Sequence, residues 1–317
     1  MLKLDNVTIS YKNVPTVQNF NLDMKEGQIV SLVGESGSGK TTVIRAVLGL
    51  LAGGGKVTEG SITFEGEDLL SYTPEQWRKL RGSDISMIFQ DALTALNPVM
   101  TIGKQMDEIY RCHEKISKKE AKMRSIKALK AVGIPDAELR YHAFPHELSG
   151  GMRQRVLIAM AFACEPEVII ADEPTTALDV TIQAQILELL SKMQKEKQTA
   201  LLLITHDLSV VRSMADRIAV MYSGKIVEEA PAKELLENPL HPYTKGLMAA
   251  VARLDDDKKE FVQIPGHLPD PADKPAGCYF HPRCPYAAAA CKKAMPLLTQ
   301  NQQGRKVRCY EAGKFKE

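Results

Sequence analysis

Residues 34–41 read Gly34-Glu35-Ser36-Gly37-Ser38-Gly39-Lys40-Thr41, which fits the phosphate-binding pattern G-x-x-x-x-G-K-[ST] of a P-loop. The apolar run 29–33 precedes this stretch, and residues 42–48 follow it with helical spacing. The stretch therefore lies between a predicted buried strand and a predicted helix, which is the context that the motif requires. The alternative is a glycine-rich turn with a chance lysine, and the flanking strand and helix disfavour it.

The residue types in this loop suit the binding of a nucleotide. The glycines Gly34, Gly37 and Gly39 let the backbone curl, so that its N–H groups form a nest for phosphate at a helix N-terminus. Lys40 would reach the β- and γ-phosphates of ATP, and the Thr41 hydroxyl would ligate Mg²⁺. The predicted nucleotide-binding set of the loop also includes Ser36 and Thr42.

Composition places the chain among globular proteins. It has 317 residues, of which 44% are hydrophobic and 25% charged, so it can bury a sizeable core in about two domains. The net charge of +2 argues against a dedicated nucleic-acid binder. No apolar stretch approaches the roughly 18 residues of a membrane-spanning helix. Since the first residues lack the pattern of a signal peptide, we expect a cytosolic protein whose six cysteines are not paired as disulfides.

Apolar patterns predict an α/β fold with a P-loop NTPase core. Residues 2–10 and 18–24 alternate apolar with polar, as antiparallel strands with one buried face do, and 57–64 and 85–89 predict further strands. Continuous apolar runs at 168–171, 201–204 and 218–221 indicate strands buried on both faces, hence a largely parallel sheet. Tyr11 ends the first strand, where it is either an ordinary aromatic or a platform for adenine.

The region 91–165 has no strand signal and reads as an inserted helical subdomain, with helical periodicity over 104–132. It ends at the segment 148–154, Leu-Ser-Gly-Gly-Met-Arg-Gln, before a helix-like run over 156–164. Ser149 is well placed as an N-cap, and Gly150 and Gly151 expose backbone N–H groups at a helix start. An ordinary capped helix would leave the double glycine unexplained, because glycine in a first turn costs stability.

Carboxylates and a histidine follow two of the apolar runs. The run at 168–171 leads into Asp172 and Glu173, at the carboxyl end of a predicted parallel strand, where ligands bind. Asp172 would hold Mg²⁺, and Glu173 would deprotonate the attacking water as general base. Asp179 follows closely, and His206 ends the run at 201–204, where we expect it to contact the γ-phosphate rather than to be structural.

In this order the motifs resemble those of the ATP-binding subunit of an ABC transporter, over residues 1 to about 255. The resemblance implies that Gln90 is the Q-loop glutamine, which with Thr41 and Asp172 makes up the predicted Mg²⁺ set. It also implies that residues 148–154 are the signature motif, which grips ATP bound mainly by a second subunit. The remaining residues that match the family's motifs are Tyr11, Asp172, Glu173, Asp179 and His206.

Two segments resemble the dipeptide and oligopeptide importer branch of this family: 89–98, which surrounds Gln90, and His241-Pro242-Tyr243-Thr244. The chain has Ala92 and Ala95 where that branch commonly has proline and serine, a departure that touches the coupling loop and not the nucleotide chemistry. Nickel importers share the C-terminal extension, so the resemblance leaves them open. We therefore predict a cassette over 1–255, with its helical subdomain at about 91–165, and an extension over 256–317.

The extension differs in composition from the cassette. Four prolines between 265 and 275 mark an extended linker. Residues 274–317 hold nine Lys or Arg and two acids, a net +7, which suits either a solvated basic tail or a ligand-binding module. Four cysteines follow: Cys278, Cys284, Cys291 and Cys309.

Four thiolates suit either a zinc ion or a 4Fe–4S cluster. The intervening lengths are five, six and seventeen residues, whereas zinc sites usually include a close pair of cysteines. The spacing, together with the iron–sulfur site that some peptide-importer ATPases carry in this extension, favours the cluster over zinc. His281 is predicted to be a bystander.

We expect an ATP-hydrolysing motor subunit at the cytoplasmic face of the inner membrane, bound peripherally. Its expected partners are a second ATPase subunit (favoured to be a paralogue), two permease subunits and, indirectly, a solute-binding protein. The alternative is a soluble ABC-type ATPase in DNA repair or translation. Such proteins usually carry two cassettes or a long coiled-coil insertion, and this chain has one cassette and an insertion of about 75 residues (91–165).

Overall fold

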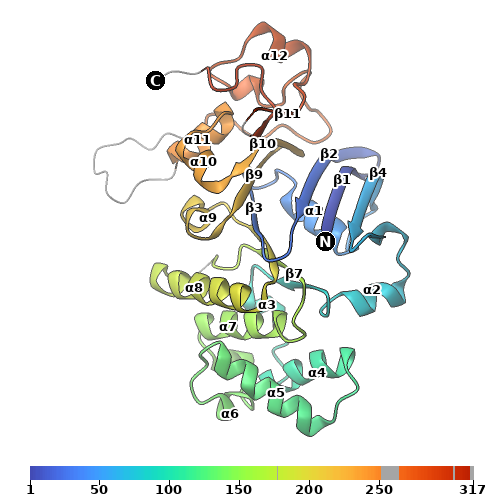
Figure 1. Cartoon of the computed structure of the whole chain (residues 1–317), viewed down its shortest axis with the longest axis vertical. Helices are drawn as coiled ribbons and strands as arrows, with labels where there is room; N and C mark the ends of the chain where they lie inside the picture. The colour runs from blue at the N-terminus through green and yellow to red at the C-terminus, as the bar shows by residue number, and fades with distance from the viewer. Residues whose placement is uncertain (177, 251–263, 303, 315–317) are drawn as a thin grey trace. The chain divides into compact units, whose positions relative to one another are not determined.

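The computed structural model describes residues 1–176, 178–250, 264–302 and 304–314 of the chain. These residues form two compact units (Figure 1). The first unit comprises Met1–Met24, Ile29–Ser71 and Ile204–Glu317, and the second comprises Lys25–Gln28 and Tyr72–Leu203. The P-loop and the C-terminal extension therefore belong to the same unit.

An antiparallel sheet of four strands begins the first unit. Its strands are β1 (Leu2–Tyr11), β2 (Val14–Met24), β4 (Gly55–Phe64) and β5 (Glu67–Asp68), in the order β2-β1-β4-β5. The antiparallel pairing predicted for the first two strands is confirmed. The strand predicted at 18–24 begins earlier, at Val14, because Val14 pairs with Tyr11 across the turn.

A second set of strands in this unit runs from the P-loop strand to the C-terminus. In the order β11-β12-β10-β9-β3 these are β11 (Thr299–Gln300), β12 (Lys306–Val307), β10 (Lys225–Pro231), β9 (Arg217–Tyr222) and β3 (Ile29–Val33). The predicted parallel pairing holds for β3 and β9, whereas β10 lies antiparallel to β9. The sequence pattern misses β10 because it buries charged residues, Glu228 among them.

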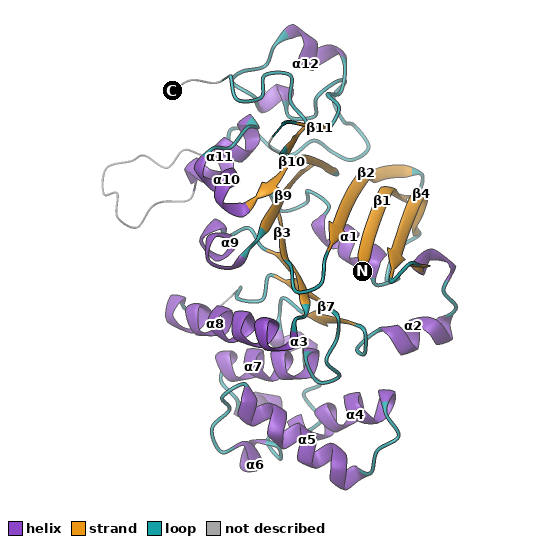
Figure 2. Cartoon of the chain, in the orientation of Figure 1, coloured by secondary structure: helices purple, strands orange, loops and turns teal. Residues whose placement is uncertain are grey.

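Short helices complete the first unit (Figure 2): α1 (Lys40–Val47), η1 (Leu69–Ser71), α9 (Leu208–Met214), α10 (Ala232–Glu237), α11 (Pro242–Ala250), η3 (His281–Arg283) and α12 (Ala289–Lys293). Tyr222, Tyr243 and Phe280 lie in one buried cluster with residues of β9 and β10. The extension therefore packs on the core through Phe280, which is 3% exposed.

The second unit has three strands in the order β8-β7-β6: β8 (Ala200–Ile204), β7 (Val168–Asp172) and β6 (Ile85–Ile88). β6 and β7 are parallel, as predicted. The described elements between these two strands are all helical, as predicted: α3 (Ala92–Ala95), α4 (Ile102–His113), α5 (Lys118–Ala131), α6 (Ala137–Arg140), η2 (Pro145–Glu147) and α7 (Gly150–Ala161). Its other helices are α2 (Pro74–Leu80) and α8 (Val180–Lys197).

The helical stretch predicted over 104–132 is two helices. α4 ends before Glu114, and α5 begins after Ser117, whose hydroxyl accepts the N–H of Glu120 at 3.1 Å. A serine with a side-chain cap starts a new helix because it satisfies a donor that has no partner within the helix. Within the described ranges, no helix is both long and apolar enough to cross a membrane.

Candidate functional site

The P-loop has the backbone conformation that its glycines permit. Gly34 has φ +156°, and a Cβ there would lie 2.2 Å from the Met221 carbonyl oxygen. Gly39 has φ +110° and precedes the first residue of α1. A residue with a side chain is strained at such angles and would collide with β9 at Gly34. The strand and helix predicted on either side of the loop are confirmed as β3 and α1.

Lys40 bridges the loop from inside. It is 7% exposed, and its Nζ donates to the carbonyl oxygens of Gly34 at 2.7 Å and Glu35 at 2.9 Å. These bonds hold the loop curled around the ammonium group. Of the three hydroxyl residues in the predicted set, Ser36 and Thr41 are exposed and Thr42 is half-buried.

Two more predicted residues lie in the first unit. Tyr11 ends β1 opposite Gly55 of β4, and a Cβ at Gly55 would lie 2.6 Å from the Tyr11 ring. Because Gly55 has no side chain, it leaves room for the Tyr11 ring on the sheet. His206 is exposed after β8, next to Asp207, whose carboxylate accepts the N–H of Ser209 at 2.8 Å and starts α9.

Gln90 and Glu173 meet in the second unit because of strand register. Ile88 of β6 pairs with Ala171 of parallel β7, so the residues two positions on come to the same edge. Gln90 Nε2 donates to Glu173 Oε2 at 2.8 Å, and the Thr176 hydroxyl donates to the same oxygen at 3.0 Å. Glu173 has φ +46°, a left-handed conformation that is uncommon for glutamate and costs about 1–3 kcal/mol.

Asp172, the predicted Mg²⁺ ligand, and Glu173, the predicted general base, differ in burial. Asp172 is the last residue of β7 and is 8% exposed, whereas the following Glu173 is half-buried. An exposed or half-buried carboxylate can act on water, while a buried one at a strand end suits a fixed cation.

The signature segment and Asp179 lie at adjoining helix starts. The Ser149 hydroxyl caps α7 by accepting the N–H of Met152 at 3.3 Å. Asp179 caps α8 by accepting the N–H of Ile182 at 2.9 Å. A Cβ at Gly151 would lie 2.8 Å from Ile182 Cγ2, so this glycine is needed for the two helices to pack. At Gly150 the nearest atom would be Leu178 Cδ2 at 3.6 Å, so its glycine is not required by packing.

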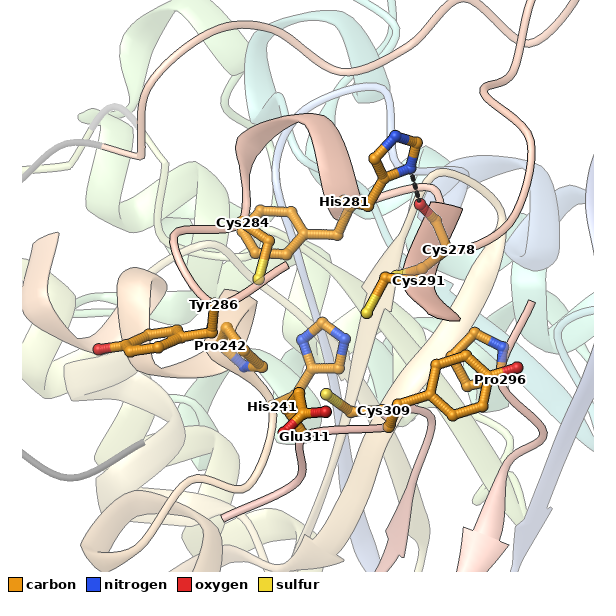
Figure 3. Close-up of a pocket in the computed structure, with 12 residues that line it drawn as sticks. His241, Pro242, Cys278, His281, Cys284, Tyr286, Cys291, Pro296, Cys309 and Glu311 are labelled. Carbon is orange, nitrogen blue, oxygen red and sulfur yellow. Dashed lines mark hydrogen bonds between the residues drawn. The ribbon is translucent and has the colours of Figure 1, made fainter. Parts of the chain in front are cut away.

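The four cysteines of the extension line one pocket (Figure 3). The pocket is small, with a cavity volume of about 10 Å³. Burial raises the pKa of the Cys309 thiol to about 12, although the N–H of Glu311 donates to it. Backbone N–H groups also donate to Cys278 from Phe280 and His281, and to Cys284 from Tyr286.

The predicted metal site is not confirmed. In the ranges that the structure describes, no three His, Cys, Asp or Glu side chains come together as ligands of one metal ion. The four thiols share a pocket without converging on a single point. Neither the 4Fe–4S cluster nor its zinc alternative is supported by such a grouping. His281 lines the pocket, and its Nδ1 lies 2.9 Å from the Cys278 carbonyl oxygen.

His241 lines the same pocket (Figure 3). The sequence-based prediction of site residues did not include it. It is 1% exposed, and its Nδ1 accepts the Tyr243 N–H at 3.0 Å, which places the proton of the neutral ring on Nε2. No described residue accepts a hydrogen bond from Nε2. Burial lowers the pKa of His241 to about 3, so the ring is neutral. The signal in the sequence that could have identified His241 was its place in the His-Pro-Tyr-Thr segment.

Family models match both parts of the chain. The model for ABC transporters matches residues 17–176, and the model for the C-terminal region of oligopeptide and dipeptide transporters matches residues 227–291. The chain belongs to the ABC transporter ATP-binding family. The predicted resemblance is thereby confirmed, and the chain is an ABC-type ATPase.

Curated relatives in this ABC family match nearly the whole chain. An oligopeptide transport ATP-binding protein of Bacillus subtilis is 47% identical over 94% of this chain and 91% of its own length. A dipeptide transport ATP-binding protein of Haemophilus influenzae is 47% identical over 93% of this chain and 89% of its own length. An oligopeptide transport ATP-binding protein of Haemophilus influenzae is 45% identical over 99% of this chain and 98% of its own length.

Solved ABC structures resemble the fold. A dimeric ATP-binding cassette with bound ADP and phosphate has a TM-score of 0.65 at 32% identity, covering 73% of this chain and 99% of that one. A Clostridium perfringens component of an ABC transporter complex has a TM-score of 0.66 at 30% identity, covering 74% of this chain and 90% of its own. The cassette part of the predicted fold class is thereby confirmed.

Proposed function

We propose that this chain is the ATP-hydrolysing subunit of an importer for dipeptides or oligopeptides. The observation that carries the proposal is the match of its C-terminal part, residues 227–291, to the model for the C-terminal region of oligopeptide and dipeptide transporters. Relatives named for peptide transport align over 90% or more of the chain. This breadth disfavours the alternative of a soluble ATPase in DNA repair or translation. A nickel importer remains the second candidate from the shared extension.

The residue roles in this proposal follow from position and chemistry. The P-loop glycines and Ser36, with Lys40 and Thr42, would hold the phosphates, and Tyr11 would stack on adenine. Mg²⁺ would be held by Thr41, Gln90 and Asp172. Glu173 would take the proton of the attacking water, and His206 would contact the γ-phosphate. The partner subunit's ATP would be gripped by Ser149, Gly150, Gly151 and Asp179.

The proposed partners are a second ATPase subunit, favoured to be a paralogue, and two permease subunits, with a solute-binding protein acting through them. The dimeric cassette among the similar structures supports the ATPase pair. Large apolar side chains beside Gln90 support the contact with permeases: Phe89, Leu93 and Val99 are 48%, 65% and 80% exposed. We place the chain peripherally at the cytoplasmic face of the inner membrane. Its proposed domain boundary, 255/256, lies outside the described residues.

Uptake and co-purification test the peptide-importer proposal. Replacing the chromosomal gene by a Glu173→Gln allele is expected to abolish uptake of a radiolabelled dipeptide or tripeptide while leaving radiolabelled nickel uptake intact. The tagged wild-type chain is expected to purify from solubilised membranes with two permeases and a second ATPase. Loss of nickel uptake alone would make nickel the substrate, and purification with ribosomes or DNA-repair proteins would contradict the transporter assignment.

For the cysteine pocket we propose a 4Fe–4S cluster held by Cys278, Cys284, Cys291 and Cys309. Thiolates on a single zinc ion lie about 2.3 Å from the metal and must converge closely, whereas a cubane takes ligands from separate turns. Backbone N–H groups donate to Cys278, Cys284 and Cys309 in the pocket. The Nε2–H of His241 has no acceptor among the described residues. Such donors stabilise anionic sulfur, which supports the proposal. A cluster there would add an electron-accepting centre or a structural clamp.

Metal and sulfide analysis of anaerobically purified protein tests this assignment. Brown protein with broad visible absorption, containing iron and sulfide in equal amounts, is the expected result. A Cys291→Ser variant is expected to lose both the colour and the iron, and a Cys112→Ser variant, which removes an exposed thiol outside the pocket, is expected to keep them. Colourless protein with one zinc per chain would replace the cluster by zinc, and protein without metal would remove the assignment.

A further inference from the structure

The second residue of the P-loop, Glu35, is held by the C-terminal part of the chain. Its backbone N–H donates to the Tyr243 hydroxyl at 2.9 Å. Its carboxylate oxygens accept from Arg283 Nη1 at 3.2 and 3.1 Å. These two partners lie 208 and 248 positions further along the chain, on α11 and at the end of η3. The fold therefore brings the extension onto the phosphate-binding loop.

Arg283 is fixed in this position by its other contacts. Its Nε donates to the Pro265 carbonyl oxygen at 2.7 Å, its Nη2 to the Ile264 carbonyl oxygen at 3.3 Å, and its Nη1 lies 3.4 Å from the Tyr222 hydroxyl. The Arg283 side chain is 7% exposed and that of Glu35 is 28% exposed. A guanidinium with this many partners is held beside one carboxylate.

The position of Glu35 is electrostatically unfavourable for a P-loop. Its carboxylate belongs to the same turn as the N–H groups that form the anion nest, and a negative charge there repels phosphate. A cation that neutralises Glu35 and holds its side chain beside the C-terminal extension removes most of this repulsion. Arg283 makes the ion pair that does this.

We propose that Arg283 is a positioning residue for nucleotide binding, which acts by neutralising and holding Glu35, so that the C-terminal extension completes the phosphate-binding site of this chain. The proposal rests on ATP binding at the P-loop, which family membership provides. Arg283 does not touch the nucleotide in this account; it acts through Glu35. Because Arg283 directly precedes Cys284, the same short helix serves the P-loop and the cysteine pocket.

A purely structural role of Arg283 would give a different pattern of mutational effects. Its bonds to the carbonyl oxygens of Ile264 and Pro265 brace the start of the extension, and losing them would affect folding whatever the charge at Glu35. In the proposed role, by contrast, removing the Glu35 charge compensates for loss of Arg283. The two roles are therefore separated by a double-mutant cycle.

The test measures the dissociation constant of a non-hydrolysable ATP analogue with Mg²⁺ for the full-length chain at low salt. Arg283→Ala is expected to weaken binding roughly tenfold, within the usual range of couplings between neighbouring sites. The loss should shrink for ADP, vanish for adenosine, and decrease as added salt screens the repulsion between Glu35 and the phosphates. Glu35→Gln is expected to bind the analogue more tightly, and the Glu35→Gln/Arg283→Ala double variant to recover most of the loss.

Lys293→Ala provides the control, because it removes one positive charge from an exposed position on α12 and is expected to bind as the wild type does. Wild-type affinity in Arg283→Ala, or a double variant as weak as Arg283→Ala, overturns the proposal. If Arg283→Ala does not fold, Glu35→Gln still decides, since unchanged or weaker binding by that variant contradicts the charge argument. Failure of the wild-type chain to bind the analogue would instead contradict ATP binding itself.

Discussion

At the scale of single residues, Glu173 combines a place at the end of a buried strand with a strained backbone conformation. It follows the buried end of β7 in a left-handed conformation, and its carboxylate accepts from Gln90 and Thr176. Strain of this kind persists where the surrounding structure holds a side chain in a required direction. The two hydrogen bonds to Oε2 set the direction of the carboxylate.

We expect Glu173→Gln to slow ATP turnover by about 10²–10⁴-fold, because the amide cannot accept a proton as a general base. Nucleotide affinity should be retained, since Lys40 and the loop amides are unchanged. Steady-state ATPase rates and nucleotide binding are measured side by side. Glu188→Gln, the same substitution at an exposed position of α8, should behave as the wild type. Turnover at the wild-type rate in Glu173→Gln would remove this residue from the mechanism.

At the scale of elements, β10 holds the end of the cassette together through a buried carboxylate. Glu228 is fully buried, and its oxygens accept the backbone N–H groups of Leu240 and His241 at 2.8 and 2.9 Å. Arg305, directly before β12, donates to Glu228 at 3.1 Å and also to the Asn238 carbonyl oxygen. One side chain thus joins β10, the turn before α11 and the C-terminal strands.

Glu228→Ala should destabilise the chain by about 3–5 kcal/mol, because it leaves the buried Arg305 charge and two backbone donors without an acceptor. Chemical unfolding followed by circular dichroism measures the effect. Glu237→Ala, at the exposed end of α10, is the control and should change stability by less than about 0.5 kcal/mol. A loss below 1 kcal/mol in Glu228→Ala would mean that water or a rearranged partner replaces the carboxylate.

The basic extension is organised by the same kind of interaction. Arg283, Arg305 and Arg308 have side chains that are buried or nearly so, and Arg308 donates to the carbonyl oxygens of Ile226 and Pro296. The solvated-tail interpretation of the net +7 is therefore wrong for these arginines. Their charges hold the extension onto the rest of the first unit, and the exposed charge is carried by lysines such as Lys292 and Lys293.

At the scale of the whole molecule, the residues proposed to bind nucleotide are found in each of the two units and in a second copy or paralogue. The P-loop, Tyr11 and His206 belong to the first unit, and the signature segment belongs to the second. Gly150 is free of packing constraints whereas Gly151 is not, so an acidic side chain at Gly150 can be introduced without disturbing the contact of Gly151 with α8. Gly150 therefore gives a clean probe of the interface between subunits.

We expect Gly150→Asp to abolish ATP-dependent dimerisation while the monomer binds ATP normally, because the new carboxylate would oppose the partner's γ-phosphate. Sedimentation in the Glu173→Gln background, with the paralogue present if the pair is heteromeric, measures the dimer. Ala184→Asp, which adds the same charge at an exposed position of α8, should leave dimerisation intact. Persistent dimerisation and unchanged ATPase activity in Gly150→Asp would contradict the role of residues 148–154 across the interface.

Local sequence was sufficient for the phosphate nest and for the type of most elements. The glycine pattern at 34–39, the apolar runs and the N-cap at Ser149 depend on neighbouring residues alone, because backbone sterics and hydrogen bonds act within a few positions. The register of β6 and β7, which joins Gln90 to Glu173, could not be read from either strand by itself. The charged strand β10 could not be predicted from its own residues either, because its carboxylates are buried only where distant arginines form ion pairs with them.

The amino-acid sequence by itself determined that this chain carries a P-loop, a helical insertion and a cysteine-rich extension, since each depends on local composition and spacing. The tertiary structure decided that the four cysteines share a pocket with His241 and that Arg283 reaches Glu35 across 248 positions. Such contacts arise from packing of the aromatic cluster around Tyr222 and Phe280, which brings distant segments together. Periodicity reports which face of an element is buried, and only packing specifies the partner that buries it.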